Sequence, residues 1–166
     1  MFDSHRRRDA LVRSSVVVGS AAAVGSILTA PNSPWYHRLD KPSWQPPPAA
    51  FPIVWTALYA STAVATSLAS ADLAESDRAD RSRALERALV VNMVLNAGWT
   101  GLFFRARRPW LATVECALLT ASSVDLARRA GAAGRGKATS IGLYAGWCLF
   151  ATTLSGAIAR RNGTRR

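Results

Sequence analysis

Residues that build catalytic and metal sites are scarce in this chain. Its 166 residues include only two cysteines and two histidines, and they contain neither an HExxH zinc motif nor a glycine-rich phosphate-binding loop. Cys116 and Cys148 lie separately inside apolar runs, so we expect small packing residues rather than a disulfide or a metal site. His37 lies in an aromatic loop, where a polar surface residue is the simpler interpretation than a haem-iron ligand. The motifs therefore assign no catalytic residue and no metal ligand, and enzymatic activity stays open.

Acidic residues are also few. Ten Asp and Glu accompany 21 Lys and Arg, which gives a formal net charge of +11. Such a charge can indicate nucleic-acid binding. Here the basic residues form short clusters between apolar runs, and the aromatic residues lie inside those runs or in one proline-rich loop. We therefore expect basic residues that flank a membrane, and no nucleic-acid partner.

Charge is scarce or absent over five apolar runs: residues 11–30, 51–71, 88–104, 109–127 and 139–159. Each run has about the length of a helix that crosses a bilayer, which needs roughly 20 residues. Backbone groups in lipid must be hydrogen-bonded internally, so these runs must be helical. The sequence predicts an all-α integral membrane bundle of five transmembrane helices. It divides the chain into a basic tail (1–10), a membrane domain (11–159) and a second basic tail (160–166).

The first apolar run also resembles a secretory signal peptide, since basic residues precede it. The run is longer than a usual signal core, and the bulky Leu28 precedes Pro31 where a small residue is needed for cleavage. We interpret it as an uncleaved first helix. A small excess of Lys and Arg on the side of the N-terminus predicts that this terminus is cytoplasmic.

A loop rich in aromatic residues and proline separates the first two runs. Its segment KPSWQPPP, residues 41–48, cannot be helical, because proline removes backbone donors and fixes φ. A stiff loop loses little entropy when it closes on a ligand. We predict that it folds over one mouth of the bundle and forms the rim of a site for a flat, hydrophobic ligand.

Aromatic side chains continue into the apolar runs at helical spacing. Trp55, Trp99 and Trp147 lie too far inside their runs to be simple interface anchors, so ligand contact and ordinary packing both remain open. Residues that share a face are Phe51, Trp55 and Tyr59 in the second run; Asn92, Asn96, Trp99 and Phe103 in the third; and Tyr144, Trp147, Ala151 and Leu154 in the fifth.

Polar groups inside the runs need a partner, since an unpaired amide in hydrocarbon is costly. Asn92 and Asn96 should therefore face protein or ligand. Glu115 has either a functional role or a neutral structural one, whereas Asp125 lies near the end of its run and should reach the interface. In the first run, small residues at four-residue spacing predict a face for close helix packing: Ser15, Gly19 and Ala23.

Four motifs in this order resemble the TspO/MBR family of tryptophan-rich sensory proteins and mitochondrial translocator proteins. They are WYxxLxKPSWxPP at residues 35–47, FxxVWxxLY at 51–59, LNxxWxxxFF at 95–104 and YxxWxxFATxL at 144–154. The resemblance implies a five-helix membrane bundle, often dimeric, that binds porphyrins, haem and related tetrapyrroles. By motif position, Trp55 and Trp147 resemble two tryptophans that line the ligand pocket of the family. The resemblance places around them Tyr36, Trp44, Tyr59, Asn96 and Trp99.

The chain departs from the family pattern in the fifth run. Leu143 stands where a proline usually precedes the tyrosine, and Ser155 stands where an asparagine usually follows the last leucine. The sterol-recognition pattern at the end of this run is therefore incomplete, which leaves sterol binding open.

The residues and the resemblance together predict a membrane protein that binds porphyrin or haem as a ligand, in tetrapyrrole handling or stress sensing. It would need no cofactor, would lie in the cell membrane of a bacterium, and could form a homodimer. Arg38 and Lys41 could pair with the propionates at the rim, face lipid headgroups, or pair with Asp40. Two alternatives use the same residues: an enzyme that degrades porphyrin with light or oxygen, and a transporter of tetrapyrroles or other small hydrophobic ligands.

Overall fold

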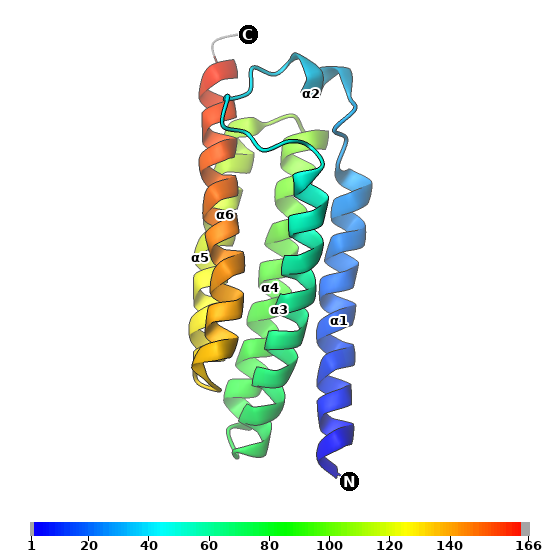
Figure 1. Cartoon of the computed structure of the whole chain (residues 1–166), viewed down its shortest axis with the longest axis vertical. Helices are drawn as coiled ribbons and strands as arrows, with labels where there is room; N and C mark the ends of the chain where they lie inside the picture. Colours follow the sequence, from blue (N-terminus) through cyan, green and yellow to red (C-terminus); the bar gives the residue numbers. More distant parts are fainter. Residues whose placement is uncertain (1, 164–166) are drawn as a thin grey trace.

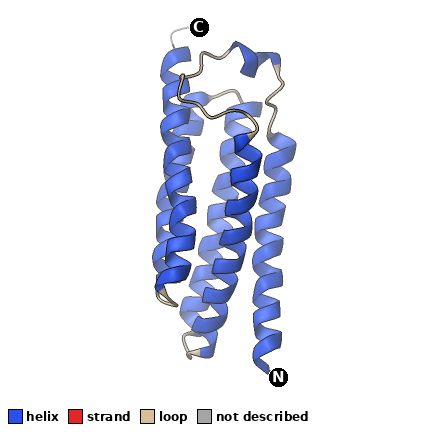
Figure 2. Cartoon of the chain, viewed as in Figure 1, coloured by secondary structure: helices blue, strands red, loops and turns tan. Residues whose placement is uncertain are grey.

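The computed structural model describes residues 2–163, and side-chain surroundings from residue 5 onward. The described chain is helical and contains no strand (Figure 2). Five long helices lie side by side as one bundle (Figure 1). They are α1 (Phe2–Leu28), α3 (Ala50–Glu75), α4 (Ala79–Thr100), α5 (Pro109–Gly131) and α6 (Arg135–Asn162). A short helix, α2 (Pro34–Arg38), lies in the first connection, and a π-helical turn, η1 (Gly101–Arg105), extends α4.

Four helices are long and apolar enough to cross a membrane by themselves: α1 from His5, α3, α5 and α6. The helix α4 differs because its first turns carry Asp80, Arg81 and Arg83, and its apolar part continues into η1. Together α4 and η1 contain the third predicted run, 88–104. The predicted all-α bundle of five membrane helices is confirmed.

The helices extend beyond the apolar runs on the side of the N-terminus. Most of the expected tail 1–10 lies in the first turns of α1, and the connection between α3 and α4 is reduced to residues 76–78. Ion pairs between helices stabilise these extensions. Arg7 on α1 contacts Asp72 and Glu75 on α3, at 3.3 and 2.9 Å. Lys137 on α6 contacts the other carboxylate oxygen of Asp72 at 2.5 Å.

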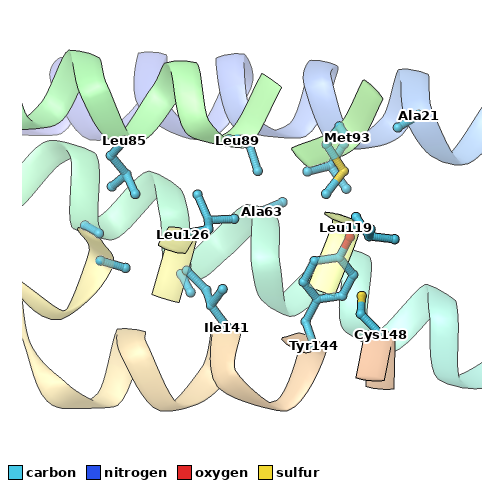
Figure 3. Close-up of a cluster of buried hydrophobic side chains, with 14 of the residues drawn as sticks. Ala21, Ala63, Leu85, Leu89, Met93, Leu119, Leu126, Ile141, Tyr144 and Cys148 are labelled. Atoms are coloured by element: carbon cyan, nitrogen blue, oxygen red, sulfur yellow. The ribbon is translucent and has the colours of Figure 1, made fainter. Parts of the chain in front are cut away.

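The interior of the bundle combines leucines with small and polar residues. Figure 3 shows Leu85, Leu89 and Met93 of α4 facing Leu119 and Leu126 of α5. Serine and threonine hydroxyls are buried, while large apolar side chains such as Val94 and Leu143 are two-thirds exposed. This inverted pattern suits a lipid surround, because hydrocarbon solvates an exposed valine or leucine as well as the protein core does.

The helix α1 turns a different face to its neighbours from the one predicted. Ser15, Gly19 and Ala23, which were predicted to form a face for close helix packing, are exposed and do not pack against the other helices of this chain. The buried residues of α1 are Ala10, Ser14, Val18, Ala21 and Gly25. Small residues occur all around α1, and therefore the sequence spacing did not determine which face packs.

The proline-rich connection crosses the end of the bundle where α6 ends, as predicted (Figure 1). The side chain of Asn162 ties it to α6: its Oδ1 accepts from the backbone N–H of Asp40, and its Nδ2 donates to the Asp40 carbonyl, both at 3.0 Å. Arg161 adds an ion pair to the Asp40 carboxylate at 3.4 Å. The loop is thus fixed over one mouth of the bundle at its middle.

Candidate functional site

One group of rings, here called the tryptophan cluster, joins α3, α6 and the proline-rich loop. Trp147 lies at its centre, with ring centroids 5.0 Å from Phe150, 6.1 Å from Phe51 and 6.4 Å from Trp55. The remaining members are Trp44, Tyr59 and Tyr144, each in ring contact with a residue already named. Four predicted site residues therefore lie together: Trp44, Trp55, Tyr59 and Trp147.

A second group, the η1 cluster, lies where the first connection meets the end of α4. Phe103 is buried and contacts Trp35 at 5.7 Å, Tyr36 at 6.3 Å and Trp99 at 5.8 Å. Phe104 completes the group. The predicted residues Tyr36 and Trp99 thus belong to a different ring cluster from Trp55 and Trp147.

A π-helical turn, η1, carries the two phenylalanines of this cluster. The backbone N–H of Ala106 donates to Gly101 at 2.9 Å, an i to i−5 bond that widens the helix by one residue. The extra residue brings Phe103 and Phe104 toward the same rings, although adjacent residues of an α-helix point about 100° apart. Single π turns occur often at functional sites. The sequence offered no signal for it.

A hydrogen-bonded network lies beneath the tryptophan cluster. The hydroxyl of Tyr59 donates to Asn96 Oδ1 at 2.5 Å, and Asn96 Nδ2 donates to the hydroxyl of Tyr144 at 3.2 Å. Tyr144 in turn donates to Asn92 Oδ1 at 2.9 Å, and Asn92 Nδ2 donates to Ser123 at 2.9 Å. Both amides are thus paired within the protein, as expected for buried polar groups. Asn92 takes the helix-contact role that the sequence left open.

Tyr144 is one of three cluster residues that the predicted site omitted, with Phe51 and Phe150. Its side chain is fully buried, its ring contacts Trp55 edge-on at 6.2 Å, and its hydroxyl joins Asn92 to Asn96. A signal was available, because Tyr144 precedes Trp147 by three residues on one helix face.

Two polar atoms of the tryptophan cluster and its loop are buried without a hydrogen-bond partner among the described residues. They are Trp147 Nε1, a donor, and Gln45 Oε1, an acceptor. The indole of Trp99 is different, because its Nε1 donates to Ser155 at 3.2 Å. Buried polar groups are nearly always paired, so the unpaired indole N–H of Trp147 is an exception among the rings of this cluster.

The two predicted rim cations lie apart. Lys41 Nζ is 4.4 Å from the centre of the Tyr36 ring, a cation–π contact. Burial raises the pKa of the Tyr36 phenol, against the effect of a hydrogen bond from Gln45, so the ring under Lys41 stays neutral. Arg38 is exposed and points to a separate cavity at the start of α5. Asp40 forms its ion pair with Arg161, rather than with Arg38 or Lys41.

The other intramembrane groups lie away from the rings. Glu115 is partly buried where α5 crosses α4, and a Cβ at Gly98 would lie 2.9 Å from its Oε1. Asp125, which was predicted to reach the interface, has a half-exposed side chain and pairs with Arg129 one turn later at 2.6 Å. Cys116 and Cys148 are buried free thiols in the contact of α5 with α6.

Comparison with known proteins adds a family match and three relatives. The profile of the TspO/MBR family matches residues 14–161. The tryptophan-rich protein TspO of Bacillus cereus is 25% identical over 135 residues, which cover 81% of this chain and 85% of that protein. The tryptophan-rich protein TspO of Chlorobaculum tepidum is 32% identical over 63% of this chain and 67% of its own length. The human translocator protein is 28% identical over 77% of this chain and 75% of its own.

Proposed function

Since the chain belongs to the TspO/MBR family, we propose that this integral membrane protein binds a porphyrin- or haem-type tetrapyrrole at the tryptophan cluster. It would act in tetrapyrrole handling or stress sensing, in the cell membrane of a bacterium. The observation that carries the proposal is the set of contacts around Trp147, whose indole N–H is buried and unpaired between Trp55, Phe51 and Phe150.

The chemistry of the cluster suits a planar macrocycle. A porphyrin offers two apolar faces, on which indole rings stack favourably. Trp55 and Trp147 meet nearly perpendicularly, at 86°, so one can contact a face and the other an edge. In the structure these rings also contact each other. A ligand must therefore separate them, and the motion would begin at the loop.

The loop side of the cluster is the natural entrance. Trp44 is 49% exposed and contacts the bundle through one ring, Phe150, at 5.9 Å. Lifting Trp44 exposes Phe150 and then Trp147 behind it, since those two rings are neighbours. Lys41 lies three residues before Trp44 and provides a cation for a propionate at this entrance.

The test is a titration of the purified protein with protoporphyrin in the dark, followed by tryptophan fluorescence and porphyrin absorbance. Trp55→Ala and Trp147→Ala should each weaken binding by about 1–3 kcal/mol, because each removes a stacked ring. Trp110→Ala is the control, since Trp110 is 54% exposed and lies outside the cluster. Equal weakening by all three variants would contradict the assignment of the site.

The same samples, illuminated in air, distinguish binding from the two alternatives. A new absorbing product would identify the enzyme, with Trp55 and Trp147 as the reacting rings. A spectral shift without product leaves binding or transport. Uptake of porphyrin into vesicles that contain the protein then separates these two.

A further inference from the structure

We propose that the cavity at the start of α5 binds the phosphate headgroup of an anionic phospholipid. The cavity has a volume of about 720 Å³ and lies between the first connection, the start of α5 and the end of α6. Its lining includes three arginines and two tryptophans: Arg38, Arg107, Arg108, Trp35 and Trp110. This site shares no lining residue with the tryptophan cluster, so it does not depend on the function proposed above.

The arginines of the cavity have no anionic partner among the described residues. Arg38, Arg107 and Arg108 form no ion pair there, whereas Arg7, Arg13 and Arg161 each contact a carboxylate. Three unpaired guanidinium groups around one cavity repel one another, and an anion in the cavity relieves that repulsion. Guanidinium matches the geometry of phosphate oxygens, which it binds through two parallel hydrogen bonds.

The backbone of this connection places two of the arginines side by side. Arg107 has a φ of 54°, a left-handed conformation that glycine usually supplies after a helix. The amide of Arg108 donates to the Leu102 carbonyl at 3.0 Å and fixes the turn. Pro109 then begins α5, whose first turn directs unpaired amides and a positive dipole end toward the same region. Arg107 thus occupies a backbone conformation that glycine adopts with less strain. It lies next to the N-terminal end of α5, which favours anions.

The surface below the cavity indicates a lipid rather than a soluble phosphate. Trp110, Leu111, Val114 and Leu118 lie along one side of α5, and each is more than half exposed. Their spacing forms an apolar track that runs from the cavity toward the middle of the bundle. Trp110 at its top is a usual residue of the membrane interface. A molecule with an anionic headgroup and an acyl chain would contact the arginines of the cavity and the apolar track at the same time.

The experiment measures lipid binding to the delipidated full chain in an uncharged detergent by native mass spectrometry. Phosphatidylglycerol should bind about tenfold or more tightly than phosphatidylcholine with the same chains, because only the first carries a net charge. Arg107→Gln/Arg108→Gln should remove most of this preference. The matched control is Arg81→Gln/Arg87→Gln, which removes the same charge from exposed positions of α4 at the opposite end of the bundle.

Three outcomes would overturn the proposal. Equal affinity for the two lipids in the wild-type protein would show that the arginines do not distinguish an anionic headgroup from one without net charge. An equal loss in the control variant would show attraction by net charge alone. Displacement of the lipid by millimolar inorganic phosphate would identify a site for free phosphate. If the double variant does not fold, Arg38→Gln in the exposed loop provides the same comparison without altering the turn before α5, and an unchanged preference in it would also overturn the proposal.

Discussion

At the scale of single residues, a substitution that removes the indole nitrogen of Trp147 distinguishes a role in ligand binding from a role in packing. Because Nε1 has no partner among the described residues, Trp147→Phe removes no hydrogen bond from the free protein. Without ligand we expect the melting temperature to fall only by the effect of the lost ring atoms, and protoporphyrin binding to weaken by about 1 kcal/mol through the lost donor. Trp99→Phe is the matched comparison, since it breaks the bond to Ser155 and should lower the melting temperature. A Trp147→Phe protein that is destabilised as much as Trp99→Phe without ligand would contradict this role.

Asn92 illustrates the opposite case, a polar residue that serves the fold. Its Nδ2 donates to Ser123 and its Oδ1 accepts from Tyr144, so Asn92→Leu removes one hydrogen bond from each of two buried hydroxyls. Interhelical hydrogen bonds in membranes contribute about 0.6–1.7 kcal/mol each, and we expect a loss of stability in that range or slightly above it. Thermal unfolding in detergent measures it. The double variant Asn92→Leu/Ser123→Ala should regain part of the loss, and strict additivity would argue against the bond.

At the scale of elements, the proline-rich loop is attached at its middle by hydrogen bonds, whereas Trp44 contacts the bundle through one ring, Phe150. The side chain of Asn162 makes both hydrogen bonds to the Asp40 backbone. We expect Asn162→Ala to loosen the loop and to raise the rate constants of porphyrin association and dissociation together. Stopped-flow fluorescence measures both rates. Asn32→Ala, an exposed asparagine of the same connection, is the control. Unchanged rates in Asn162→Ala would mean that the ligand enters elsewhere.

At the scale of the whole molecule, the bundle has two chemically distinct ends. The end near the N-terminus carries interhelical ion pairs, and the other carries the loop and both ring clusters (Figure 1). The excess of basic residues on the N-terminal side predicts that this side is cytoplasmic. A membrane-impermeant maleimide applied to intact cells should label Ser43→Cys and spare Ser76→Cys, both exposed positions. Cys116 and Cys148 are buried, so the parent protein should stay unlabelled. The reverse pattern would invert the topology.

The amino-acid sequence by itself determined the number and class of the helices. Bilayer thickness fixes the length of a spanning helix, and backbone groups in lipid must pair internally. Apolar runs of this length with little or no charge can therefore be recognised as membrane helices. The proline segment at residues 41–48 likewise predicted a stiff loop from covalent geometry alone. Spacing on single helices also brought Trp55 and Tyr59 to one face, where their rings are 5.4 Å apart.

Only the tertiary structure decided which faces meet. Lipid is as apolar as the interior, so hydrophobicity does not orient a membrane helix, and α1 therefore buries Ser14 and Val18 rather than Ser15 and Gly19. The π turn after Thr100 carries Phe103, whose ring contacts Trp99 and Tyr36 and so forms a second ring cluster. Arg38 lines the same cavity as Arg107 and Arg108, although it lies in a different connection, far from them in the sequence. Such placements depend on how neighbouring helices fit together, which no local pattern encodes.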